Sequence, residues 1–239
     1  MILLEIGNTR WKLAALLEQE LNFIEHGEGL DNLLRRLTDY QGQQLLFASV
    51  ASDELNQQLQ QGLTQLGMVF VQTQTEAAAS GVINAYADYQ RLGVDRWLTL
   101  LAARQRKHAL TAIVDVGTAV TFDLLNSDGH HLGGWIAPGL NTMQDSLVAR
   151  SQRITARIDA PAEVLGRSTE DGLYLGCQAA VQGFVKQAQV KTNEVSDLPV
   201  DWLFTGGGMH YLNTNGFINY EIRPHLVLEG LAVVAADLG

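Results

Sequence analysis

The sequence predicts an α/β fold made of two related halves. Strand-like apolar runs alternate with segments of helical periodicity, which is typical of α/β domains. An acid-x-Gly-[Asn/Thr] turn follows such a run at Glu5 and again at Asp115, so the two copies lie 115 − 5 = 110 positions apart. That spacing is too long for a solenoid repeat and suits a duplicated domain. We therefore predict an N-terminal half, 1–110, and a C-terminal half, 111–239.

The first half opens with a predicted β-hairpin. Its strands are residues 1–4 and 11–16, joined by the turn at 5–9. After it we expect a helix within 27–40, a strand at 44–50, a helix from Ser52 to about Leu66 and a strand at 68–71. Asp31 and Ser52 are candidate N-caps, because their side chains can accept backbone N–H groups.

Residues 73–89 lose this periodicity and are expected to form an irregular segment that contains Tyr86. Gly93 then precedes an apolar helix, with Asp95 at or near its first turn. Asp95 is either a helix cap or a general base, and Arg96 is either in a solvated salt bridge or binds a carboxylate or phosphate. The segment alone favours the cap and the salt bridge.

The second half begins with the strongest motif of the chain. Strand-like runs at 111–114 and 120–125 flank a turn that contains Asp115, Gly117 and Thr118. Gly117 is expected to adopt a positive φ, so that backbone N–H groups face an anion, and Thr118 adds a hydroxyl donor. The Asp115 carboxylate is a suitable ligand for a hard cation.

Five further elements complete the second half. They are a strand at 132–136, a helix at 140–148, a helix that starts near Ser168 or Thr169, a strand at 199–204 and an apolar helix at 226–238. The Pro138-Gly139 turn is equally well explained as an anion site at a helix start or as a plain connection. Three glycines at 206–208 either approach a flat ligand such as adenine or form a flexible turn.

Composition narrows the classes of function. The net charge is −10 and the pI about 4.9, which argues against a nucleic-acid surface. The single cysteine, Cys177, indicates a reducing compartment, and no apolar stretch is long enough to span a bilayer. We expect a cytoplasmic protein that contacts neither nucleic acid nor membrane.

The ordered set of motifs resembles the type III pantothenate kinases, within the acetate and sugar kinase, heat-shock chaperone and actin superfamily. The motifs, each weak alone, cover nearly the whole chain: Gly7 to Lys12, Gly93 to Trp97, Asp115 to Asp123, Gly133 to Gly139, Ser168 to Gly172 and Phe204 to Gly208. The resemblance implies duplicated ribonuclease-H-like, or actin-like ATPase, domains with a nucleotide cleft between them. It also implies ATP-dependent phosphorylation of pantothenate to 4'-phosphopantothenate, the first step of coenzyme A biosynthesis.

The resemblance also implies roles for single residues. Asp95 would be the catalytic base. Asp115 would bind a monovalent cation, K⁺ or NH₄⁺. The resemblance further implies that the protein is a homodimer. ATP would be bound by Glu5, Ile6, Gly7, Asn8, Thr9, Arg10, Trp11, Lys12, Thr118, Gly206 and Gly207. Pantothenate would be bound by Tyr86, Gly93, Val94, Asp95, Arg96 and Thr169.

One position departs from the family pattern. The first loop of the family usually opens with Asp, whereas this chain has Glu5, whose carboxylate extends one methylene further. Mg²⁺ held through water tolerates that shift better than direct coordination does, because Mg²⁺ usually keeps several waters. Two alternatives accompany this reading: another small-molecule kinase of the same superfamily, and a non-catalytic transcription accessory factor on the same fold.

Overall fold

The computed structural model describes residues 1–106, 109–151 and 153–238, and the chain forms two compact units. The first unit contains 1–108, 128–131 and 225–239, and the second contains 109–127 and 132–224. The C-terminal segment thus belongs with the first unit, whereas the sequence grouped 111–239 together. The reason is packing: Gly230 lies so close to the backbone of Leu98 that a Cβ there would collide with the Leu98 carbonyl.

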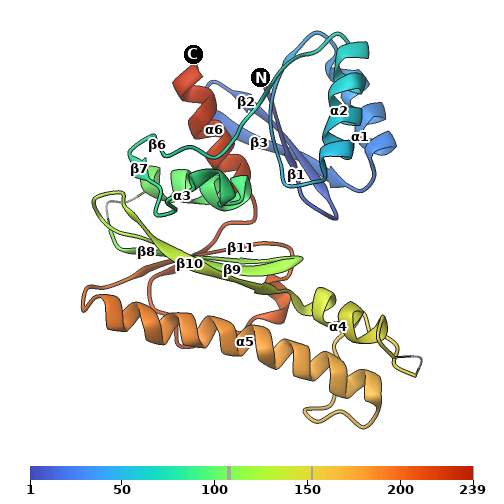
Figure 1. Ribbon diagram of the computed structural model, residues 1–239, viewed down its shortest axis with the longest axis vertical. Coiled ribbons are helices and arrows are strands. Elements are labelled where there is room, and N and C mark those ends of the chain that lie inside the picture. The colour runs from blue at the N-terminus through green and yellow to red at the C-terminus, as the bar shows by residue number, and fades with distance from the viewer. Residues whose placement is uncertain (107–108, 152, 239) are drawn as a thin grey trace. The chain divides into compact units, whose positions relative to one another are not determined.

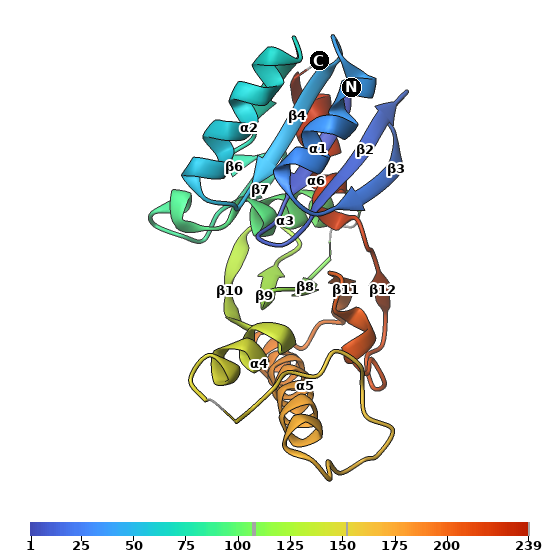
Figure 2. The same cartoon turned by 90° about the vertical axis from the view of Figure 1, so that its right-hand side faces the viewer.

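The first unit is a five-stranded sheet with helices on it (Figures 1 and 2). Its sheet strands are β1 (Ile2–Ile6), β2 (Trp11–Leu17), β3 (Glu20–Gly27), β4 (Gln44–Ser49) and β5 (Val69–Gln72). Its α-helices are α1 (Leu30–Leu37), α2 (Asp53–Gln65), α3 (Val94–Arg106) and α6 (Leu226–Leu238). Short elements connect them: η1 (Thr38–Tyr40), β6 (Ala78–Ala79), β7 (Val82–Ile83) and η2 (Tyr89–Arg91).

The second unit also contains a five-stranded sheet, and the long helix α5 runs along it (Figure 1). Its strands are β8 (Thr111–Val116), β9 (Ala119–Leu125), β10 (His131–Pro138), β11 (Asp201–Thr205) and β12 (Tyr220–Ile222). Its helices are α4 (Leu140–Val148), α5 (Thr169–Val195) and the short η3 (Met209–Tyr211).

The two sheets repeat one topology. Their strand orders are β3-β2-β1-β4-β5 and β10-β9-β8-β11-β12. In each, the first strand pairs antiparallel with the next strand and parallel with the strand after the following helix or helices. Glu5 and Asp115 both occupy the penultimate position of that first strand. The duplication predicted from the two turns is therefore confirmed.

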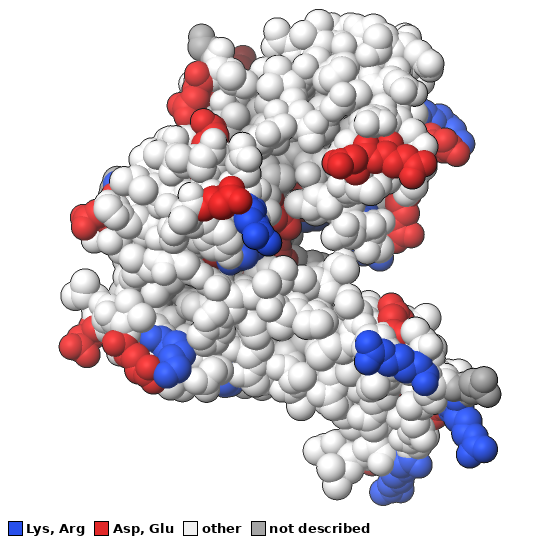
Figure 3. All heavy atoms as spheres, viewed as in Figure 1, with Lys and Arg blue, Asp and Glu red and all other residues white. Residues whose placement is uncertain are grey.

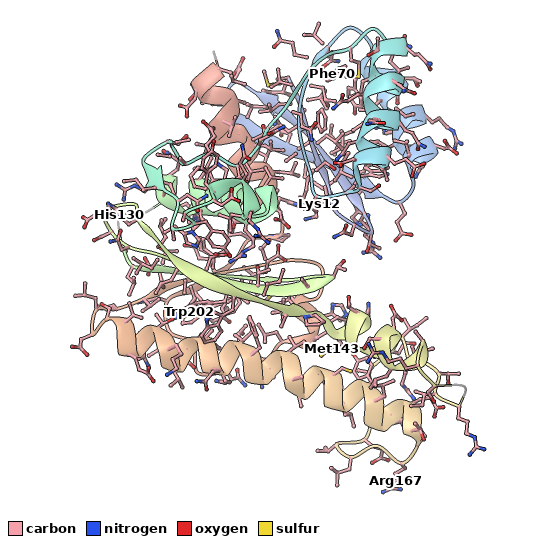
Figure 4. All side chains as sticks on the ribbon, in the orientation of Figure 1. Lys12, Phe70, His130, Met143, Arg167 and Trp202 are labelled. Carbon is pink, nitrogen blue, oxygen red and sulfur yellow. The ribbon has the colours of Figure 1, made fainter. Side chains whose placement is uncertain are left out.

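Each unit has its own apolar core. In the first, buried side chains of β1 and β4 pack with Leu33 and Leu37 of α1 and Leu59 and Leu63 of α2. In the second, alternate residues of β8 and β9 pack against α5, and Figure 4 labels two members of this layer, Trp202 and Met143. Both sheets thus hold their first-strand acid at the edge of a rigid core.

The structure corrects three local expectations. Strands β3 and β12 were not predicted. Asp31 lies inside the first turn of α1, whose N-cap is Gly29 with φ +76°, so the expected Asp31 cap is wrong. Gly117 is not among the glycines with positive φ, so that expectation is also wrong. The expected Ser52 cap is confirmed, since its hydroxyl accepts the Leu55 N–H at 3.3 Å.

Candidate active site

The first loop is the short turn between β1 and β2. Gly7 N–H donates to the Arg10 carbonyl at 2.9 Å, and Asn8, Thr9 and Arg10 are exposed. Glu5 and Lys12 face each other at the base of the turn, in register across the two strands. The loop therefore presents polar groups to solvent above an internal ion pair.

That ion pair is well formed. Lys12 Nζ donates to both Glu5 carboxylate oxygens, at 3.2 and 3.1 Å, and the Glu5 side chain is 16% exposed. Burial raises the pKa of Glu5 above its ordinary value of 4.5, the Lys12 charge and hydrogen bond oppose that rise, and the Asp95 charge adds to it. Asp95 is therefore close enough to Glu5 for its charge to affect the Glu5 pKa, a proximity that the sequence did not predict.

Asp95 is in the first turn of α3, one residue beyond its start. Gly93 accepts the Trp97 N–H at 3.0 Å, and Asp95 Oδ1 accepts the Arg96 N–H at 2.8 Å. A Cβ on Gly93 would lie 2.5 Å from Asp95 Oδ1, so a larger residue there would displace the carboxylate. The glycine of this motif thus leaves room for the acid that follows it.

Arg96 and Tyr86 form a second pair in the first unit. Arg96 is buried, at 8% exposure, and its Nη1 donates to the Tyr86 hydroxyl at 3.2 Å. The guanidinium carbon also lies 5.9 Å from the centre of the Tyr86 ring. The structure therefore joins two of the six residues that the resemblance assigned to pantothenate, although ten positions separate them in sequence.

The second loop, between β8 and β9, is held through its backbone. Gly117 N–H donates to the Ala119 carbonyl at 2.9 Å. The Thr118 carbonyl accepts from Gly139 N–H at 2.9 Å and from Thr142 Oγ1 at 2.6 Å. These bonds fix the loop against the start of α4, while Gly117 and Thr118 remain exposed.

The three glycines after β11 close on the same loop. Gly208 N–H donates to the Val116 carbonyl at 2.7 Å. Gly206 has φ +96°, and a Cβ on it would collide with Asp115 Oδ1 and the Val116 carbonyl oxygen. The glycine run is therefore required for close packing against the second loop, so it is more than a flexible turn.

Each loop has oxygen atoms that could bind a cation. Asp115 Oδ1 and the Val116 carbonyl oxygen both lie 2.3 Å from the position that a Cβ on Gly206 would take, so these two oxygen atoms face the same side of Gly206. Among the described residues, no group of three His, Cys, Asp or Glu could hold a metal ion. Glu5 is a single carboxylate, which fits Mg²⁺ that is held mainly through waters and phosphate oxygens.

The family model for type III pantothenate kinases matches residues 1–191. The chain belongs to the type III pantothenate kinase family. A type III pantothenate kinase of Idiomarina loihiensis is 34% identical over 260 residues, which cover 100% of this chain and 99% of that protein.

Solved structures extend the likeness to the fold. A protein named as a Baf family transcriptional activator from Campylobacter jejuni has a TM-score of 0.63 and 19% identity, covering 100% of this chain and 99% of its own. MreB 5 of Spiroplasma citri, bound to AMPPNP, has a TM-score of 0.52 and 11% identity, covering 99% and 96%. The predicted class of duplicated actin-like ATPase domains is confirmed.

The structure also places Thr169 and one residue outside the motifs, His131, in this member of the type III pantothenate kinase family. Thr169 is the exposed first residue of α5, and the cap is Ser168, whose hydroxyl accepts the Asp171 N–H at 3.1 Å. His131, which the sequence analysis missed, stacks on Tyr86. A lone histidine after a turn carries no periodic signal that would have identified it.

Within the described residues, no helix is both long and apolar enough to cross a membrane.

Proposed function

We propose that this chain transfers the γ-phosphoryl group of ATP to the primary hydroxyl of pantothenate, giving 4'-phosphopantothenate at the start of coenzyme A biosynthesis. Family membership supports the reaction. The observation that carries the site is the arrangement at the start of α3, where Gly93 makes room for the Asp95 carboxylate and Arg96 pairs with Tyr86.

Asp95 is the proposed general base. It accepts the hydroxyl proton of pantothenate as the hydroxyl oxygen bonds to the γ-phosphorus and the bond to the β,γ-bridging oxygen breaks. Its Oδ1 is held by the Arg96 N–H, which fixes the carboxylate in one orientation.

Tyr86 and Arg96 are the proposed anchors of the substrate. Pantothenate carries a carboxylate, and a guanidinium that is oriented by a neighbouring hydroxyl is a good partner for that group. Gly93, Val94 and Thr169 are proposed as further contacts. Phosphoryl transfer leaves the protein mainly the tasks of positioning and of charge stabilisation, so such anchors contribute directly to rate.

The two loops are the proposed phosphate sites. Residues 5–12 and Thr118 offer exposed backbone and hydroxyl donors, and Gly206 and Gly207 are proposed to contact the adenosine part of ATP. When bound, Mg²⁺ near Glu5 would neutralise phosphate charge. Asp115 and the Val116 carbonyl are the proposed ligands of K⁺ or NH₄⁺.

We further propose a cytoplasmic homodimer that binds neither nucleic acid nor membrane. Three apolar side chains in the segment before α5, Ile158, Val164 and Leu165, are 80–90% exposed, and their burial between two copies of the chain would be favourable. On the face drawn in Figure 3, Lys and Arg occur in small separate groups, several of them beside Asp or Glu. That distribution supports the expectation of no nucleic-acid surface. Sedimentation of the purified protein tests the dimer.

A coupled ADP-release assay tests the kinase. ADP release should require pantothenate and should increase when Na⁺ is replaced by K⁺ or NH₄⁺. ADP release with a different small acceptor, and none with pantothenate, would favour another kinase of the superfamily. A folded protein that binds neither ATP nor pantothenate would favour a non-catalytic accessory factor.

A further inference from the structure

We infer that His131 is a positioning residue for pantothenate, acting through Tyr86 and Arg96; this inference rests on the proposed function. The His131 and Tyr86 rings are stacked, with centroids 6.1 Å apart and an interplanar angle of 15°. His131 is buried, at 3% exposure, Tyr86 is half-buried, and both residues belong to the first unit. The Tyr86 ring is thereby bounded by the imidazole and by the Arg96 guanidinium.

His131 also holds the backbone that carries Tyr86. The Ala85 N–H donates to His131 Nδ1 at 3.4 Å, and the Tyr86 N–H donates to Asn84 Oδ1 at 3.0 Å. Because Nδ1 accepts this bond, the neutral imidazole carries its proton on Nε2. One side chain thus contacts both the ring of Tyr86 and the Asn84–Ala85 peptide group, which lies one residue before it.

The segment that supplies His131 is docked on the same irregular loop. Residues 128–131 join β9 to β10 and yet belong to the first unit. Ile83 N–H donates to the Gly129 carbonyl at 2.8 Å, and Ile83 forms a parallel bridge with His130. Gly129 has φ +89°, and a Cβ there would collide with the Gly81 carbonyl oxygen. The backbone contact therefore fixes His131 in place before any substrate binds.

The consequence for binding follows from the Tyr86 hydroxyl. That hydroxyl accepts from Arg96 Nη1, so a rotated Tyr86 ring would break this hydrogen bond and remove one restraint on the guanidinium. Loss of the imidazole should therefore lower the affinity for the substrate carboxylate and leave the general base and the phosphate loops unchanged. This predicts a change in KM for pantothenate and little change in kcat or in KM for ATP.

The test compares variants at position 131 in the ADP-release assay. His131→Ala should raise KM for pantothenate about 3- to 10-fold, the range expected for one aromatic pair, with kcat within about 2-fold. His131→Phe restores a planar ring and should recover most of the loss. His131→Leu fills the space without a planar ring, so it should resemble His131→Ala and carries the test if the alanine variant does not fold.

Two controls separate positioning from general stability. His225 stacks on Phe23 at 4.0 Å in the same unit, so His225→Ala removes a comparable stack and should leave KM for pantothenate unchanged. In a Tyr86→Ala background, His131→Ala should have no further effect on that KM. An unchanged KM in His131→Ala and His131→Leu, or an equal rise in KM for ATP, would overturn the inference. A wild-type protein inactive with pantothenate would instead overturn the proposed function, and this inference with it.

Discussion

Two carboxylates from distant parts of the sequence interact in the first unit, Glu5 at the end of β1 and Asp95 at the start of α3. Lys12 donates to both oxygens of Glu5, and Asp95 Oδ1 accepts the Arg96 N–H at 2.8 Å. The two carboxylates therefore differ in role: Glu5 forms an ion pair with a residue of the neighbouring strand, and Asp95 is the proposed general base.

Replacing Asp95 should separate chemistry from nucleotide binding. Asp95→Asn keeps the size of the side chain and removes the base, so kcat should fall by about 10²–10⁴ while the Kd for ATP stays near the wild-type value. Steady-state kinetics and ATP titration measure both. Asp88→Asn, an exposed change in the loop before η2, is the matched control. Normal turnover by Asp95→Asn would remove Asp95 from the role of base.

Glu5 should make stability depend on pH in a defined direction. Its pKa is raised above 4.5 by burial, so the folded protein holds this proton at higher pH than the unfolded chain. The Glu5 contribution to the free energy of unfolding is then full below pH 4.5 and is lost as pH rises through the raised pKa. Urea unfolding across that range should show the loss in wild type and not in Glu5→Gln. Parallel pH profiles for the two proteins would contradict this.

Single residues show where sequence reasoning succeeds. The motifs identified Tyr86, Asp95 and Arg96, and the structure brings Tyr86 and Arg96 together and sets Asp95 in the first helical turn. The motifs did not identify His131 or the proximity of Asp95 to Glu5. In both cases the residues come from segments that are distant in sequence, and no periodic pattern in the sequence indicates that they meet.

At the scale of elements, the second loop owes its shape to its neighbours. Gly117, which lies in the loop, does not have a positive φ, whereas Gly206 does. Gly139 packs so closely against the loop that a Cβ on it would collide with the Gly117 carbonyl oxygen. The anion-binding character expected of the loop thus depends on glycines in two other elements. All of these glycines are prominent in the sequence, but a positive φ was expected at Gly117, whereas the structure has it at Gly206.

Adjacent glycines offer a clean comparison. Gly206→Ala should lower the free energy of unfolding by about 2 kcal/mol or more, through a collision with the loop and an unfavourable φ. A Cβ on Gly207 meets nothing within 4 Å, so Gly207→Ala should change it by less than about 0.5 kcal/mol. Chemical denaturation measures both variants. Equal losses would show that the close approach does not govern stability.

Elements with weak patterns escaped prediction. The burial of β3 lacks a strict alternation, and a register shift between Leu13 and Ala14 interrupts its pairing with β2. The edge strand β12 has only three residues, with Tyr220 and Ile222 exposed. The elements with continuous apolar runs, β8 and β9, and those with clear helical sequence patterns, α2 and α6, were predicted with nearly correct limits because their own residues specify them.

At the scale of the whole molecule, α6 completes a unit that begins more than 200 residues earlier. Its buried side chains include Leu226, Leu228 and Leu231, and it packs on α3 and on strands β1 and β4. An apolar helix at the chain end was predicted, but its partner could not be, since apolar periodicity does not say which sheet a helix covers.

Removing this helix should unfold the first unit. A chain that ends at Pro224 exposes the α3 surface around Leu98, so we expect loss of cooperative thermal unfolding and binding of a hydrophobic dye. A chain that lacks only residues 238 and 239 is the control, because Leu238 is 58% exposed. Unchanged cooperative melting of the shorter chain would contradict the assignment of α6 to this unit.

The chain passes from one unit to the other after residues 108, 127, 131 and 224. A hybrid gene that joined the first 110 codons of one relative to the remainder of another would therefore build the core of the first unit from segments of two different proteins. It would also set the 128–131 turn of one parent on the loop of the other. Recombination between diverged copies should succeed only where these interleaved segments are exchanged as a set.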